Sequence, residues 1–176
     1  MAEPTSPLVT VSWLAAHLDD PRVAVADVRW YLSGKRGADE YARGHLPGAI
    51  FVDVDVELSS PPRPDRPGRH PLPSAAQMSA VLSRLGAGKD TTVVAYDDAG
   101  GGIAARLWWL MRYFGLGGGV VLDGGIQAWA ASGSPLTTHV PAPRPAPPLA
   151  LTADPRMVVD KHAVAKLARS PSSLVL

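Results

Sequence analysis

The sequence predicts an α/β fold in which helices flank a mainly parallel β-sheet. Short apolar runs alternate along the chain with segments of helical periodicity, which is typical of parallel strands joined by helices. Several apolar runs end in aspartate or a glycine-rich stretch, as strands do where they lead into functional loops. The length of 176 residues, 46% of them hydrophobic and 19% charged, suits one globular domain with a further segment.

Four elements are predicted in the first half of the chain. Residues 12–18 have a short helical pattern and begin with a serine that suits an N-cap. Residues 23–27 form an apolar run ending in aspartate, which favours a buried strand. Residues 39–43 predict a short helix that Gly44 stops, and the apolar residues 49–54 predict a second strand.

Five elements are predicted in the second half. Residues 74–85 are amphipathic, with a serine cap, a glutamine at the capping-box position and a glycine stop, so they predict a helix. Residues 91–96 are β-branched and apolar and predict the clearest strand. Residues 103–114 predict a helix that is apolar nearly all round and therefore buried. Residues 120–123 predict a strand, and residues 125–132 predict the helix after it.

Two proline-rich segments interrupt this alternation. Residues 61–73 are rich in proline and arginine, and they are expected to lie on the surface as extended chain. Residues 141–148 contain five prolines in eight positions, a composition typical of a semi-rigid linker with few contacts to its neighbours.

The segment after the linker resembles the start of the chain. Residues 158–176 repeat the plan of residues 9–26, which is a strand, a short helix, a proline turn and an apolar strand. We therefore predict a domain over residues 8–140, a Pro-rich linker over 141–155 and the start of a second copy over 156–176. The alternative is a C-terminal strand and helix that pack back onto the first domain.

Charge and composition exclude several classes of function. A net charge of +1 gives little attraction to nucleic acid or an anionic membrane, so neither is expected as a partner. No apolar run approaches the ~20 residues of a membrane span, and the first residues lack a signal-peptide pattern, so a cytoplasmic protein is expected. The chain has no cysteine, which excludes disulfides and a thiol nucleophile on it.

The loop at residues 96–102 is the first candidate site. Ligands of parallel sheets bind where strands lead into helices, which selects this loop together with residues 27–29 and 53–57. Three glycines before a helix free backbone N–H groups to bind an anion, although a flexible connection is the simpler alternative. Asp97 and Asp98 place negative charge where that anion would lie.

Asp53, Asp55 and His70 are further candidates. An Asp-x-Asp pair after a strand is typical of phosphatases of the haloacid-dehalogenase type, which hold Mg²⁺ between carboxylates. The competing interpretation is that both aspartates cap the end of the strand. His70, in the proline-rich excursion, suits either acid–base chemistry or a solvated position.

Taken in order, these segments resemble the rhodanese family over residues 8–140. More narrowly, they resemble the N-terminal, non-catalytic domain of tandem-domain sulfurtransferases that use thiosulfate or 3-mercaptopyruvate. The motifs that carry the resemblance are DVR at 27–29, GHLPGA at 44–49, YD at 96–97, AR and WW at 105–109, and LDGG at 122–125.

The resemblance implies that a cysteine in a C-terminal domain accepts sulfane sulfur as a persulfide. That cysteine would lie beyond residue 176, so the chain is expected to be truncated and inactive alone, with donor and acceptor bound through the other domain. Neither a cofactor nor a metal is implied. Asp97 takes the nucleophile position of a vestigial loop, whose members are Asp97, Asp98, Gly100, Gly101, Gly102 and Arg106.

The resemblance also implies a contribution to catalysis at the domain interface. Asp55 and His70 match an aspartate and a histidine that the family lends to an acid–base relay with a serine of the other domain. Two alternatives stay open at this point, namely a stand-alone inactive rhodanese module that binds a partner and the Asp-x-Asp phosphatase.

Overall fold

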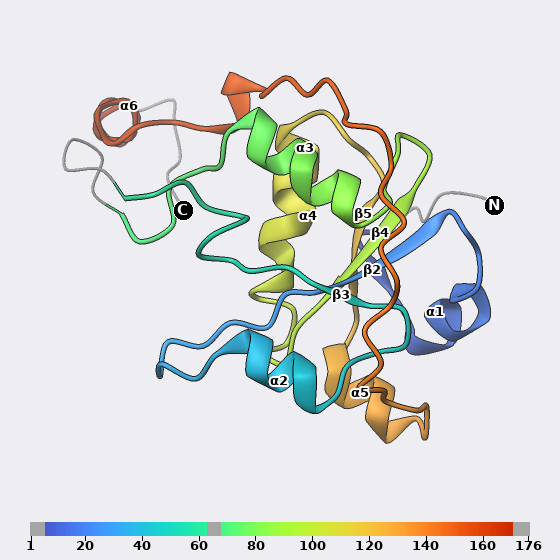
Figure 1. Ribbon diagram of the computed structural model, residues 1–176. Coiled ribbons are helices and arrows are strands. Elements are labelled where there is room, and N and C mark those ends of the chain that lie inside the picture. Colours follow the sequence, from blue (N-terminus) through green and yellow to red (C-terminus); the bar gives the residue numbers. More distant parts are fainter. Residues whose placement is uncertain (1–5, 63–67, 171–176) are drawn as a thin grey trace.

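A parallel β-sheet forms the centre of the molecule (Figure 1). The computed structural model describes residues 6–62 and 68–170. Within them the sheet has five strands in the order β1-β5-β4-β2-β3, and every neighbouring pair is parallel. The strands are β1 (Leu8–Val9), β2 (Val23–Asp27), β3 (Ile50–Phe51), β4 (Thr92–Tyr96) and β5 (Gly119–Leu122). The predicted α/β class is confirmed.

Helices cover both faces of this sheet. The described helices are α1 (Val11–His17), α2 (Gly37–Arg43), α3 (Ala75–Arg84), α4 (Ala104–Tyr113), α5 (Gly125–Ala131), α6 (Lys161–Leu167) and the short 3-10 helix η1 (Pro155–Met157). Successive strand residues point to opposite faces. In β4, Val93 and Ala95 pack with α3 and α4, while Val94 and Tyr96 pack with α1 and α5. Figure 1 shows α1 on one side of the sheet and α3 with α4 on the other.

The elements predicted within residues 8–140 are found, with local differences that have physical causes. Helix α1 begins one residue early, because Thr10 and not Ser12 is its N-cap and accepts the N–H of Trp13. Strand β3 keeps only two of the six predicted residues, because a turn begins at Asp53. The capping box of α3, between Ser74 and Gln77, is present as predicted.

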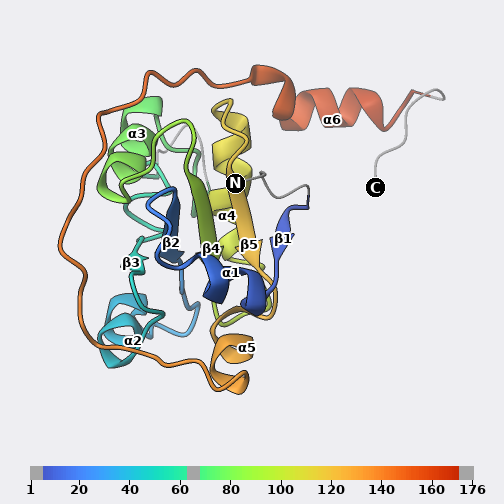
Figure 2. The ribbon, with the colours of Figure 1, turned by 90° about the vertical axis from the view of Figure 1, so that its right-hand side faces the viewer.

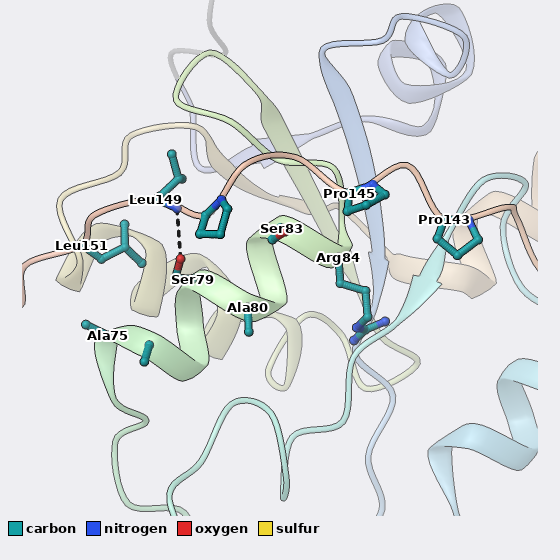
Figure 3. A pocket seen from close by; sticks show the side chains of 11 residues that line it. Ala75, Ser79, Ala80, Ser83, Arg84, Pro143, Pro145, Leu149 and Leu151 are labelled. Carbon is teal, nitrogen blue, oxygen red and sulfur yellow. Dashed lines mark hydrogen bonds between the residues drawn. The ribbon is translucent and has the colours of Figure 1, made fainter.

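The Pro-rich segment is not the weakly attached linker that its composition predicted. Its backbone hydrogen-bonds to α3: the N–H of Ala146 donates to the carbonyl of Ser83, and the N–H of Leu149 donates to the Ser79 hydroxyl. Leu149 and Leu151 also pack against the core. Small residues on α3 leave a shallow apolar groove of about 590 Å³ beneath the prolines (Figure 3). Extended chain has unpaired backbone groups, and the two serines satisfy several of them.

The segment after η1 leaves the body of the domain. Helix α6 has no buried residue, and Figure 2 shows it projecting away from the sheet. Val158 and Val159 are 42% and 59% exposed and belong to no described strand. Residues 171–176, the last part of the predicted second copy, lie outside the described residues. No helix in the described part of the chain is long and apolar enough to cross a membrane.

Candidate functional site

The loops selected from the sequence meet at one edge of the sheet. Strands β2 and β4 are paired so that Asp27 lies beside Tyr96, and β2 is paired with β3 so that Asp27 also lies beside Phe51. The chain segments that follow these three strands therefore begin side by side. Residues 27–29, 53–57 and 96–102, which the sequence selected as candidate loops, thus begin at the same edge of the sheet.

Asp97 fills the loop after β4 with its own carboxylate. The side chain is fully buried. Its Oδ1 accepts the N–H groups of Ala99 and Gly101 at 2.9 and 2.8 Å, and its Oδ2 accepts those of Ile103 and Ala104, both at 2.8 Å. The loop and the start of α4 thus form the anion-binding cradle that the glycines predicted. The anion that occupies it belongs to the protein.

Only some of the glycines around this cradle are required by their conformation. Gly100 and Gly101 have φ of 70° and 87°, which side-chain-bearing residues rarely adopt. Gly102 has no positive φ, so the three glycines are not equivalent. Gly125, at the start of α5, has φ of 55°, and a Cβ there would lie 2.2 Å from the carbonyl oxygen of Asp97. The cradle is therefore supported from a second helix.

Asp98 faces away from the cradle. This differs from the expectation that Asp97 and Asp98 both place negative charge in it. Its Oδ2 accepts the hydroxyl of Tyr31 at 2.6 Å. Burial, and then this hydrogen bond, raise the pKa of Tyr31. The backbone carbonyl of Asp98 accepts the side-chain N–H of Gln127. Asp98 therefore links β4 to the segment after β2 and to α5.

Asp55 and His70 are brought together, although fifteen residues separate them. The Nε2 of His70 lies 2.7 Å from Asp55 Oδ1, and the indole N–H of Trp30 donates to Asp55 Oδ2 at 2.8 Å. Burial alone would raise the pKa of Asp55, but the hydrogen bonds from Trp30 and His70 outweigh it and lower that pKa. The His70 ring also meets the Trp30 ring edge-on at 5.0 Å. These three side chains form a cluster at the exposed rim of the sheet edge.

Asp53 has the capping role that competed with a metal site. Its Oδ1 accepts the backbone N–H groups of Asp55 and Val56 and so closes the turn that ends β3. Its own N–H donates to Glu57. The carboxylates of Asp53 and Asp55 thus have different partners. Among the described residues, no group of three or more metal-binding side chains is placed to hold an ion.

Arg106 points away from the loop with which the sequence grouped it. Its Nε and Nη2 donate to the carbonyl of Leu58 at 3.0 and 2.8 Å. Its Nη2 also lies within hydrogen-bond distance of the Ser59 hydroxyl and of the carbonyls of His70 and Pro71. Burial lowers the pKa of this guanidinium. Arg106 thus belongs to the surroundings of His70.

Sequence reasoning missed a buried network beneath the site. Both carboxylate oxygens of Asp27 accept hydrogen bonds from Arg29, and the Tyr96 hydroxyl donates to Asp27 Oδ2 at 2.7 Å. Arg29 also donates to the carbonyl of Gly44, and the N–H of Leu46 donates to Tyr96. The network joins the ends of β2 and β4 to residues 44–46. The available signal was the opposite charges of Asp27 and Arg29 at the end of a buried strand.

His45 is a second residue that sequence reasoning did not single out. It is fully buried and stacks on Tyr41 with ring centroids 3.8 Å apart. Its Nδ1 lies 2.7 Å from the carbonyl oxygen of Tyr41, and its Nε2 lies 3.1 Å from that of His139. His45 therefore attaches the chain that leaves α5 to the body of the domain.

This parallel sheet, with an amide cradle between its central strand and the following helix, defines an α/β domain of the rhodanese type. The chain belongs to the rhodanese family, because the family's rhodanese-like domain matches residues 10–132. The resemblance of the motifs to the rhodanese family is thereby confirmed.

Relatives of this chain are named as sulfurtransferases. It is 44% identical over 140 residues to a probable 3-mercaptopyruvate sulfurtransferase of Pseudomonas aeruginosa, covering 78% of this chain and 49% of that protein. It is 37% identical to a thiosulfate sulfurtransferase of Rattus norvegicus, covering 79% and 48%. The crystal structure of SseA from Escherichia coli superposes with a TM-score of 0.81 at 29% identity, covering 93% and 62%. The chain spans about half the length of the curated relatives it matches.

Proposed function

We propose that this chain is the non-catalytic domain of a rhodanese-type sulfurtransferase that uses thiosulfate or 3-mercaptopyruvate. The observation that carries the proposal is the Asp97 carboxylate, which accepts all four hydrogen bonds of the cradle. The chain has no cysteine, so it offers no thiolate to take up sulfur. The relatives are named as sulfurtransferases and are about twice as long as the region that matches this chain. Their length supports a second domain that takes up the sulfur.

The proposed division of labour follows from the chemistry of the cradle. In a catalytic domain the thiolate attacks the outer sulfur of thiosulfate, the S–S bond breaks, and sulfite leaves with the electron pair. The persulfide then passes its sulfur to an acceptor such as cyanide, and the thiolate returns. Backbone N–H groups stabilise these anions. In this chain the same groups are bound to Asp97, and its charge opposes an anionic donor.

The contribution of this domain to catalysis is proposed to come from His70 and Asp55. Nε2 of His70 faces the Asp55 carboxylate, which only accepts hydrogen bonds, so in the neutral ring Nδ1 is the nitrogen that can take up a proton. A nitrogen oriented in this way can take a proton from a hydroxyl group that a neighbouring domain presents. The side chain of His70 is 21% exposed and that of Asp55 is 55% exposed, so the pair is accessible from outside.

The division of the chain into domain, linker and start of a second domain is part of the same proposal. Helix α6 buries none of its residues, and Leu167 is 42% exposed. The first helix of a second domain would expose an apolar side chain in this way when the β-sheet against which it packs is absent. The docked Pro-rich segment would then fix the point from which that domain starts.

The test is a chimera that joins this chain to the part of the Pseudomonas aeruginosa relative that this chain does not match. We expect the chimera to transfer sulfur from 3-mercaptopyruvate to a thiol acceptor. His70→Gln should lower kcat roughly 100-fold, which is the usual contribution of a general acid or base. His139→Gln, at an exposed position in the segment after α5, is the matched control and should leave the rate unchanged.

Two outcomes would count against the proposed function. Equal kcat values for His70→Gln and the unmodified chimera would remove His70 from the reaction. A folded chimera without any transfer would favour a module that binds a partner and does not complete an active site.

A further inference from the structure

The excursion that carries His70 is closed at its base. The N–H of Ser60 donates to the carbonyl of Pro71 at 3.1 Å, so the two ends of the segment lie side by side. The Ser59 hydroxyl fixes the first end, because it donates to the carbonyl of Val54 at 2.7 Å. We call residues 58–60 with 70–71 the neck of the excursion. His70 therefore lies next to this hydrogen-bonded base.

Arg106 of α4 is inserted into this neck. Its Nη2 lies 2.8 Å from the carbonyl oxygen of Leu58 on one side and 3.0 Å from that of His70 on the other. The acceptors that the described residues supply to it are three carbonyls and one hydroxyl, with no carboxylate. Burying a cation without an opposite charge is costly, and burial does lower the pKa of Arg106.

We propose that Arg106 is a positioning residue for the Asp55–His70 pair. A planar guanidinium can donate in several directions at once, so one side chain can hold both sides of the neck. With the carbonyl of His70 held by Arg106 and that of Pro71 held by Ser60, the backbone from the His70 carbonyl to Pro71 is fixed. The imidazole is then directed at Asp55, where Nε2 meets the carboxylate at 2.7 Å. The importance of this role of Arg106 for sulfur transfer rests on the function proposed above.

Arg106→Gln is the sharpest variant for testing this role. The glutamine Nε2 is as many bonds from the backbone as Nε of arginine, so it can keep the hydrogen bond to Leu58 but cannot reach His70. The readout is the pair of ring-nitrogen signals of His70 in proton–nitrogen correlation spectra of the 176-residue chain, assigned with His70→Gln. In the unmodified chain we expect two well-separated signals, with the proton on Nε2. In Arg106→Gln the two signals should move toward each other, as the hydrogen bond to Asp55 is lost and the tautomers mix.

A control on the same helix and a second variant complete the experiment. Arg112→Gln should leave the His70 signals unchanged, because Arg112 lies over the ring of Trp108 and not in the neck. Arg106→Lys keeps a cation one bond shorter than arginine and should restore part of the separation between the signals. If Arg106→Gln does not fold, Arg106→Lys compared with the unmodified chain decides the matter, and a partial loss of separation is then expected.

The inference is overturned if His70 gives unchanged ring-nitrogen signals in a folded Arg106→Gln or, failing that, a folded Arg106→Lys. The spectra need no sulfur donor and no second domain, so they are independent of the proposed function. Shifted His70 signals in Arg106→Gln, together with an active His70→Gln chimera, would uphold the positioning role and reject the catalytic one.

Discussion

Replacing Asp97 with alanine is expected to lower the free energy of unfolding by about 4 kcal/mol, because four N–H groups lose the carboxylate that accepts them. Four hydrogen bonds to a charged group would give about 6 kcal/mol at the low end of their range. Water entering the vacated space should recover part of that loss. The measurement is the midpoint and slope of urea unfolding for the variant and the unmodified chain.

Two further variants separate the loss of the hydrogen-bond acceptor in the cradle from the loss of a negative charge near it. Asp97→Asn keeps the shape of the side chain but turns an NH₂ group toward two N–H donors, so it should also be strongly destabilised. Asp98→Ala removes a carboxylate that accepts a single hydroxyl at the edge of the site, and about 1 kcal/mol is expected. A loss below about 1 kcal/mol for Asp97→Ala would show that the cradle does not depend on this carboxylate.

Replacing Arg29 with methionine is expected to cost about 3–5 kcal/mol, since it leaves the fully buried Asp27 carboxylate without its cation. The change also removes the hydrogen bond that Arg29 donates to Gly44. Urea unfolding measures the loss. Asp27→Asn combined with Arg29→Met should be less destabilised than the two single variants together, because the two residues share one network.

The chain contains a matched control for this pair at its surface. Arg22 binds Asp20 in the same Asp-x-Arg arrangement, with Nη2 2.8 Å from Oδ2, but the Arg22 side chain is half exposed. Arg22→Met should therefore change the urea midpoint very little, because solvent screens the pair. Similar losses for Arg22→Met and Arg29→Met would mean that burial does not set the contribution of Arg29.

The parts of the fold that depend on local sequence could be predicted. Strand β2 and the capping box of α3 have their signals within the element itself, and both are found where expected. The predicted strand at 49–54 was too long, because the Asp53 carboxylate ends it through hydrogen bonds that no apolar pattern reveals. The Pro-rich segment was assigned few contacts, because the partners of its backbone, Ser79 and Ser83, lie about 65 residues earlier.

The position of the candidate site could be predicted from the sequence, but the role of each residue in it could not. The order of strands and glycines predicted an anion cradle next to Asp97. Composition could not show that four N–H groups converge on that one carboxylate. Arg106 was grouped with the nearby loop because it is close in sequence, whereas its guanidinium reaches residues 58 and 70. Such roles depend on where a long side chain points, and that is decided by packing between distant segments.

Thiocyanate formation by the 176-residue chain, incubated with thiosulfate and cyanide, tests most directly whether this domain carries sulfur. Asp97 is proposed to occupy the place of a sulfur-carrying group, so the chain should carry no sulfur by itself. We expect no thiocyanate above the protein-free blank at any chain concentration. Thiocyanate that increases in proportion to the chain, and disappears when the chain is unfolded, would contradict it.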